Sequence, residues 1–339
     1  MKKQILLHNK IFFAVVLLLS MLFAQACDRP SKDQTSKQYV KISTRLKWLP
    51  GATYIGTIVA SEAGLWKEQG LDVNYFPGGF EADPIKLVAS GSNDFGITGA
   101  EQLLQARSKG IPVVAIFMEL RYSPAGWMAL KSANIKNPYD FVGRKVGAQY
   151  GTNIEPTLDA LLAKLQIPHE KLIRIPVKYN VAPLFAGQVD VLPVYLNGQP
   201  VQARLEGKEV VTINPADHGI RLYGNVYFTS EKMIRERSDV VQCFVNGLTA
   251  GWKLAVEDPK KAVDLLVAAE PKLQRDLEIA ILKATIPFIV GRSKLPLGAM
   301  TEERWQETKG IMVKYAGLDP SVSVSESYTN AFVNKAHQE

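Results

Sequence analysis

The stretch that decides the fold is residues 40–76, VKISTRLKWLPGATYIGTIVASEAGLWKEQGLDVNYF. Apolar side chains alternate with charged and polar ones over residues 40–48, which is the period of a half-buried strand. Residues 54–67 predict a helix that Gly70 ends, and a second strand is predicted over residues 71–76. The stretch therefore predicts a strand–helix–strand unit.

The same alternation continues along the chain. Helices are predicted over residues 84–89 and 101–108, and strands over residues 95–98 and 111–118. This βαβαβ order is typical of the α/β class and predicts a largely parallel sheet with helices on its faces.

From about residue 128 the theme is repeated. Predicted strands lie at 145–148, 172–177, 189–196 and 209–213, and predicted helices at 154–165, 181–185 and 201–205. Both regions contain an apolar helix followed by Gly-x-x-Asp and a strand, with Gly91 and Asp94 in the first and Gly187 and Asp190 in the second. The recurrence predicts two similarly built lobes.

The last third of the chain is largely helical. After a strand at 226–229, helices are predicted at 239–255, 259–269, 274–284 and 302–315. We expect residues 39–124 together with 223–339 to form lobe 1, and residues 125–222 to form lobe 2, with two crossovers between them. Ligands of open α/β sheets bind at the carboxyl ends of the strands, so the cleft between the lobes is the expected site.

The first 38 residues predict export. Residues 1–10 are basic, residues 11–23 form an apolar run too short to span a bilayer, and Ala24-Gln25-Ala26 offers small residues for cleavage, so residues 1–26 are predicted to be a signal peptide. Cys27 follows directly and is the expected site of lipidation, with plain secretion as the alternative. Residues 27–38 then form a polar tether between membrane and domain.

Composition excludes several classes of function. Removing residues 1–26 takes away three lysines and lowers the formal net charge from +7 to +4, and no basic stripe or nucleic-acid motif is present. The two cysteines, Cys27 and Cys243, give no disulfide framework and no metal set. We expect no nucleic acid, no metal, no cofactor and a monomer.

Catalytic motifs are also missing from the sequence. It contains no G-x-S-x-G, phosphate loop, G-x-G-x-x-G after a strand or H-E-x-x-H. His169 and His218 fall in predicted loops and are expected at the surface. The chain is therefore predicted to bind a ligand rather than to act as an enzyme.

Aromatic side chains are the first candidates for binding, because a cleft that grips a flat ring needs faces to stack on. Trp48 and Tyr54 flank a turn at the end of the first strand, although core packing is the alternative for Trp48. Trp127 lies near the first crossover, where hinge packing competes with stacking. Tyr150 precedes a helix, and Tyr223 lies at the return to lobe 1; both are included in the predicted site.

Hydroxyl and amide side chains complete the predicted site. Thr152 and Asn153 stand just before the helix at 154–165, where they either face the cleft or cap the helix. Asn197 and Gln199 end a strand on the same side, because strand side chains repeat with a period of two. Paired amides at that position suit the edge of a heterocycle.

Several of these motifs resemble those of a known family. Leu46-Lys-Trp48-Leu-Pro50, Val59-Ala60-Ser-Glu-Ala-Gly64-Leu-Trp66-Lys-Glu-Gln-Gly70, Gly91-Ser-Asn-Asp94-Phe95-Gly96, Asp140-Phe-Val-Gly143 and Tyr195-Leu-Asn197-Gly-Gln199 resemble the periplasmic binding proteins for thiamine pyrimidine precursors and their sulfonate- and nitrate-binding relatives. The resemblance covers roughly residues 40–270. It implies a type II clamshell that delivers a small molecule to an ABC permease and its ATPase.

The resemblance also implies roles for single residues. Trp48 is expected to stack on the ligand and Asn197 to hydrogen-bond it. Gln199 stands where the pyrimidine binders usually have Glu. This departure counts against an aminopyrimidine and leaves room for a carbonyl-bearing ring such as a flavin or an oxidised pyrimidine. The alternatives are a sulfonate- or nitrate-type anion, and an enzyme of the same fold that makes the thiamine pyrimidine from its own histidine and pyridoxal phosphate. That enzyme carries a CCCFC signature, which is absent here.

Overall fold

The computed structural model describes residues 38–79, 81–178, 180–291 and 294–338 of the 339-residue chain. Residues from Tyr39 onward form one compact unit. The predicted signal peptide, Cys27 and all but the last residue of the predicted tether lie outside the described residues. Among the described helices, none is long and apolar enough to cross a membrane.

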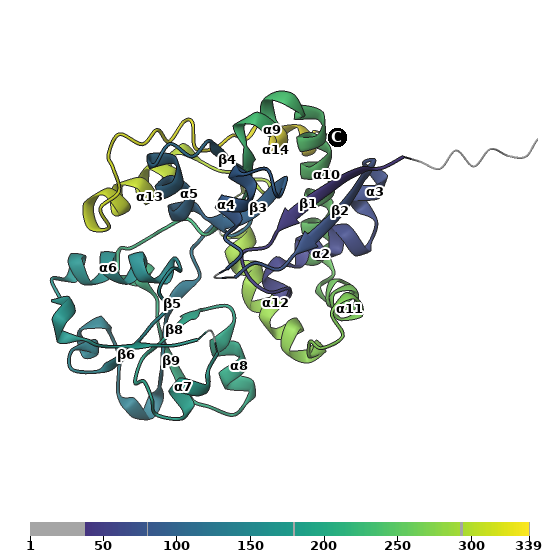
Figure 1. Cartoon of the computed structure of the whole chain (residues 1–339). Coiled ribbons are helices and arrows are strands. Elements are labelled where there is room, and N and C mark those ends of the chain that lie inside the picture. The colour runs from purple at the N-terminus through teal and green to yellow at the C-terminus, as the bar shows by residue number, and fades with distance from the viewer. Residues whose placement is uncertain (1–37, 80, 179, 292–293, 339) are drawn as a thin grey trace, which may run out of the picture. The chain divides into compact units, whose positions relative to one another are not determined.

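The first sheet has five strands in the order β2-β1-β3-β10-β4 (Figure 1). These strands are β1 (Val40–Arg45), β2 (Leu71–Phe76), β3 (Phe95–Gly99), β4 (Val113–Met118) and β10 (Asn225–Ser230). Strand β1 pairs in parallel with β2 and β3, as predicted. Strand β10 is antiparallel to both β3 and β4 and separates them. The expected unbroken parallel run is therefore interrupted, because β10 enters the sheet from a distant part of the chain.

A second group of strands lies between residues 125 and 213. Strand β5 (Ala125–Leu130) is the antiparallel centre of a three-stranded sheet between β8 (Leu192–Tyr195) and β9 (Val210–Ile213). Strands β6 (Lys145–Ala148) and β7 (Ile173–Pro176) pair in parallel. A bridge between Val146 and Val191 connects this pair to the three-stranded sheet. Residues 125–213 supply both of the smaller sheets and no strand of the five-stranded one, which supports the two-lobe division; that division remains a prediction.

Helices cover these sheets, and most begin and end close to the predicted positions (Figure 1). The helices are α2 (Ile55–Glu62), α3 (Leu65–Glu68), α4 (Pro84–Ala89), α5 (Ala100–Ser108), α6 (Ile154–Leu165), α7 (Ala182–Phe185), α8 (Gln199–Leu205), α9 (Glu231–Glu236), α10 (Ser238–Glu257), α11 (Pro259–Ala269), α12 (Arg275–Val290), α13 (Glu302–Tyr315) and α14 (Ala331–Ala336), with the short 3-10 turn η1 (Ala52–Tyr54) before α2. The helix predicted at 54–67 is in fact η1, α2 and α3. Gly64 divides it, because its φ of 73° belongs to the left-handed region that only glycine adopts readily.

The repeated Gly-x-x-Asp pattern has the same structure in both places. Gly91 and Gly187 end their helices with φ of 77° and 67°. The Asp94 carboxylate accepts a hydrogen bond from the backbone N–H of Ser43 in β1 at 2.8 Å, and the Asp190 carboxylate accepts one from the backbone N–H of Lys145 in β6 at 2.8 Å. Asp94 thereby ties the start of β3 to β1, and Asp190 ties the segment before β8 to the amino end of β6.

Candidate ligand-binding site

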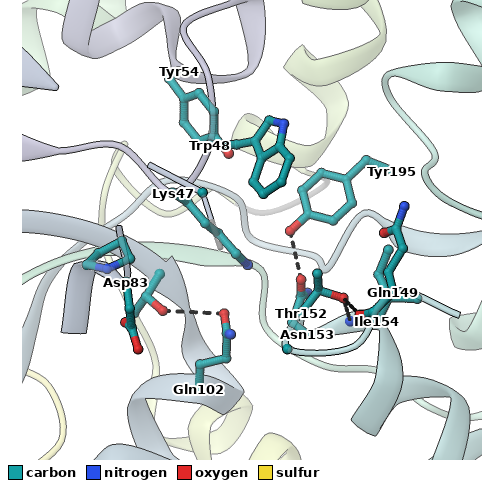
Figure 2. A pocket seen from close by; sticks show the side chains of 14 residues that line it. Lys47, Trp48, Tyr54, Asp83, Gln102, Gln149, Thr152, Asn153, Ile154 and Tyr195 are labelled. Atoms are coloured by element: carbon teal, nitrogen blue, oxygen red, sulfur yellow. Dashed lines mark hydrogen bonds between the residues drawn. The ribbon is translucent and has the colours of Figure 1, made fainter. Parts of the chain in front are cut away.

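A cavity of about 140 Å³ lies where several of these strands end (Figure 2). One side is formed by the turn after β1, η1, the segment leading into α4, and the junction of β3 and α5. The other side is formed by the loop between β6 and α6 and by the end of β8. The lining residues are Lys47, Trp48, Tyr54, Gly79, Asp83, Pro84, Thr98, Gln102, Gln149, Gly151, Thr152, Asn153, Ile154 and Tyr195.

Aromatic rings form much of the wall. Figure 2 shows Trp48 and Tyr54 together, with the ring of Tyr195 facing them from the end of β8. The hydroxyl of Tyr195 donates to Oδ1 of Asn153 at 2.9 Å. Burial raises the pKa of Tyr195, and the carboxylates of Glu101 and Glu119 raise it further, so this phenol stays protonated. The wall thus offers flat apolar faces held in place by a neutral hydrogen bond.

One ammonium group reaches the cavity. Nζ of Lys47 donates to Oδ1 of Asn225 at 3.1 Å and lies 5.7 Å from the centre of the Tyr195 ring. Burial lowers the pKa of Lys47 to about 8, and the carboxylates of Glu101 and Glu119 partly oppose that shift.

Two carboxyl groups lie close enough to this ammonium to affect its pKa. Glu101 and Glu119 are fully buried, and burial raises the pKa of both, that of Glu119 to about 8. With its pKa near 8, the Glu119 carboxyl is largely protonated at neutral pH, so it does not balance the charge of Lys47.

The loop between β6 and α6 presents a buried amide. The backbone N–H of Gln149 donates to the Glu155 carboxylate at 2.7 Å, and its carbonyl accepts from the Thr152 hydroxyl at 2.8 Å. The side chain of Gln149 is 2 % exposed, and neither its Oε1 nor its Nε2 has a hydrogen-bond partner among the described residues. Both amide atoms are buried, so the amide of Gln149 does not border the cavity space.

Four of the predicted site residues line the cavity: Trp48, Tyr54, Thr152 and Asn153. The capping alternative holds in part for Thr152, whose hydroxyl also accepts from the backbone N–H of Ile154 at 3.3 Å. Asn153 makes no side-chain capping hydrogen bond to α6. Its amide oxygen is used by Tyr195 instead.

The structure does not bring the other predicted residues to this cavity. Trp127 is fully buried in β5 and packs edge-on against Phe141 at 6.0 Å, which fits the packing alternative. Tyr223 is 2 % exposed, its hydroxyl accepts from the backbone N–H of Thr301 at 2.9 Å, and its ring packs against Trp305. Tyr150 stands in the same loop as the lining residues but is 61 % exposed.

The two predicted amides at the end of β8 are turned to other partners. Nδ2 of Asn197 donates to Thr285 of α12 at 2.8 Å. Gln199 begins α8, and its Oε1 accepts from the backbone N–H of Tyr195 at 3.0 Å. The alternation of side chains along a strand predicted that Asn197 and Gln199 share one face. Strand β8 ends at Tyr195, so this alternation does not extend to either residue.

Sequence reasoning missed Lys47, Gln149 and Tyr195. Alternation assigned Lys47 to a solvent face, yet β1 ends at Arg45 and the next residues turn into the cavity. Gln149 stands next to Tyr150 and Tyr195 stands two residues before Asn197, both of them predicted site residues. Their closeness in the sequence to these residues was the signal that could have identified them. No group of three or more His, Cys, Asp or Glu side chains able to hold a metal occurs in the described part of the chain.

The fold is that of the type II periplasmic solute-binding proteins. The nitrate-binding protein NrtA of Synechocystis superposes with a TM-score of 0.68 at 12% identity, over 89% of each chain. A family model described as "NMT1/THI5 like" matches residues 52–262, and the chain belongs to this family.

Two relatives extend along nearly the whole chain. The formylaminopyrimidine-binding protein of Halalkalibacterium halodurans is 25% identical over 95% of this chain and 99% of its own length. The 4-amino-5-hydroxymethyl-2-methylpyrimidine phosphate synthase of Legionella pneumophila is 25% identical over 86% of this chain and 92% of its own. The relatives of this chain therefore include a protein named as a binder and a protein named as an enzyme.

Proposed function

We propose that this chain is the extracytoplasmic solute-binding protein of an ABC importer and that it takes up a small aromatic heterocycle of the thiamine pyrimidine precursor type. The observation that carries the proposal is the make-up of the cavity wall. Trp48, Tyr54 and Tyr195 supply ring faces, and the side chains of Thr152 and Gln102 supply a hydroxyl and an amide. Ring faces and a few fixed polar groups are what a flat heterocycle needs.

The lining of the cavity favours a flat ring over a small anion. Lys47 is the cationic side chain among the lining residues and Asp83 the acidic one, whereas three aromatic rings border the space. A nitrate- or sulfonate-type anion would have one ammonium contact there, so the sulfonate- or nitrate-type alternative is the weaker one.

The size of the cavity favours a single ring. Its volume of about 140 Å³ is below the roughly 300–1,000 Å³ typical of sites for drug-sized ligands. An aminopyrimidine suits that space better than the three fused rings of a flavin.

The placement of the histidines supports binding without turnover. The synthase alternative uses a histidine of the protein as a reactant, and no lining residue of the described cavity is a histidine. His169 is half exposed, and its Nδ1 lies 3.7 Å from Oδ1 of Asp159. Nε2 of His337 lies 2.8 Å from the carbonyl oxygen of Leu297. His218 belongs to a 3-10 turn at Pro215–His218. We infer that the chain returns its ligand unchanged.

The cellular setting is part of the proposal. The apolar run at residues 11–23 and Cys27 support export and lipid anchoring at the membrane. The partners would then be the permease and ATPase subunits of the importer, with the binding protein acting as a monomer.

A thermal-shift panel tests the ligand class. The purified chain is screened against formylaminopyrimidine, 4-amino-5-hydroxymethyl-2-methylpyrimidine, riboflavin, taurine and nitrate. A ligand present at 100 times its dissociation constant adds about 2.7 kcal/mol to the free energy of unfolding. The proposal expects a shift with the two pyrimidines; a shift with taurine or nitrate alone would overturn it.

A further inference from the structure

Lys47 brings a positive charge into a cavity whose wall consists mainly of rings and neutral polar groups. The residue is only partly buried, and Figure 2 shows its nitrogen directed into the space between Tyr195, Asn153 and Gln102. Ring stacking alone does not account for an ammonium group at this place, because withdrawing a charge from water costs free energy unless the charge finds partners.

The folded chain holds Lys47 at both ends. Gly78 packs against the backbone that follows β1, where an added Cβ would lie 2.1 Å from the carbonyl oxygen of Leu46 and 2.5 Å from the carbonyl carbon of Lys47. At the tip of the side chain, Nζ donates to Oδ1 of Asn225, a fully buried residue of β10, at 3.1 Å. A group anchored in this way loses little conformational freedom when a ligand binds.

The ammonium of Lys47 still has donors to offer. An ammonium group carries three N–H donors and no acceptor. Among the described residues, Asn225 accepts one of these donors, and no carboxylate forms an ion pair with Lys47. Lys131 shows the ordinary arrangement, an exposed ion pair with Glu209 at 3.0 Å. The remaining donors of Lys47 suit an acceptor atom of a ligand in the cavity.

The carboxyl groups near Lys47 do not reach the cavity. All four carboxyl oxygens of Glu101 and Glu119 are buried, and neither residue is among those that line the space. Asp83 does line it, but its carboxylate accepts from the backbone N–H of Ile85 at 2.9 Å and caps α4. Burial lowers the pKa of Lys47 only to about 8, so the ammonium form predominates at pH 7. A ligand therefore meets a positive charge at this point of the wall.

A positively charged donor selects a ligand by hydrogen bonding and by charge. A hydroxyl or carbonyl oxygen on a ring substituent can accept a hydrogen bond from the ammonium, whereas a substituent that is itself an ammonium group cannot. Two like charges at hydrogen-bonding distance also repel strongly where water is largely excluded. Both effects act in the same direction.

We propose that Lys47 selects the ligand by the substituent on its ring, donating a hydrogen bond to a neutral oxygen there and excluding a cationic substituent. This inference rests on the proposed function, since it names which class of pyrimidine the cavity takes. It also gives the ammonium group a partner within the cavity.

Two probes of nearly the same shape test the selection. In 4-amino-5-hydroxymethyl-2-methylpyrimidine the substituent is a neutral hydroxyl, and in 4-amino-5-aminomethyl-2-methylpyrimidine it is an amine that is protonated at pH 7. Each probe is titrated into the full chain by calorimetry at pH 7. The wild type is expected to bind the hydroxymethyl probe about tenfold to a hundredfold more tightly than the aminomethyl probe.

Two variants remove the charge of Lys47. Lys47→Met keeps the length of the side chain, and Lys47→Gln also keeps an N–H donor. Both should lose the preference for the hydroxymethyl probe, because the cationic probe is no longer repelled while Glu101 and Glu119 remain nearby. Lys131→Met is the matched control: it removes an exposed ammonium paired with Glu209 and should keep the wild-type ratio of affinities.

Several results would overturn the inference. Equal binding of the two probes by the wild type, or tighter binding of the aminomethyl probe, would do so without any variant. A wild-type preference that persists in a folded Lys47 variant would show that the selection arises elsewhere in the cavity. Failure of the proposed function looks different, because the wild type would then bind neither probe, and the inference would fail with it.

Discussion

The buried carboxyl of Glu119 should leave a signature in the pH dependence of stability. Its pKa is about 8 in the folded chain, raised mainly by burial, against an ordinary value of 4.5. Between these values the folded state keeps a proton that the unfolded state releases. The free energy of unfolding therefore falls as pH rises from about 4.5 to about 8, by up to about 1.4 kcal/mol per pH unit from this group alone.

Lys47 contributes with the opposite slope at higher pH. Its pKa of about 8 in the folded chain lies below the ordinary 10.5. Above pH 8 the folded state has released a proton that the unfolded state still holds, so stability recovers as pH rises toward 10.5. The two groups together place a minimum of stability near pH 8.

Glu119→Gln isolates the carboxyl, because the amide keeps its shape and does not titrate. The assay is urea unfolding followed by tryptophan fluorescence at half-unit steps from pH 5 to 8. The variant should show a slope shallower than the wild type by about 1 kcal/mol per pH unit. Exposed Glu257, at the end of α10, provides the control Glu257→Gln, which should follow the wild-type curve. Parallel curves for wild type and Glu119→Gln would refute the assignment of a raised pKa to this carboxyl.

Two further predictions concern the ring face and the anchor. Trp48→Ala should weaken binding of 4-amino-5-hydroxymethyl-2-methylpyrimidine by about 0.5–1.5 kcal/mol beyond the lost contact area, measured by calorimetry; unchanged affinity would assign Trp48 to packing alone. Metabolic labelling with a palmitate analogue should mark the wild type and not Cys27→Ser, and an unlabelled wild-type chain free of the membrane would contradict lipidation.

Local signals made many elements predictable from the sequence. Strand β2 and helices α4, α6, α11 and α13 begin and end as predicted. The order of the strands in the sheet could not be predicted in the same way. Strand β10 pairs with residues more than 100 positions away in the sequence, and local patterns do not reveal such pairings. The break at Gly64 was missed because the apolar period continues across it, although the backbone does not.

The sequence predicts which residues stand at the ends of strands and helices near the cavity. It does not predict in which direction each of their side chains points. Trp48 and Asn153 reach the cavity from the ends of the elements that were expected to supply them. Gln199 turns back to the backbone of Tyr195, and no spacing rule foretells that choice of partner. Lys47 stands out only once its place in the cavity and its hydrogen bond to Asn225 are known.

Binding of a small heterocycle without chemical change can be tested in one experiment. The full chain is titrated by calorimetry with 4-amino-5-hydroxymethyl-2-methylpyrimidine, and the recovered ligand and protein are then weighed by mass spectrometry. We expect one saturable site, a ligand of unchanged mass and a protein of unchanged mass. Absence of binding, or pyrimidine formed with loss of a histidine after incubation with pyridoxal phosphate, would show that the chain is not such a binding protein.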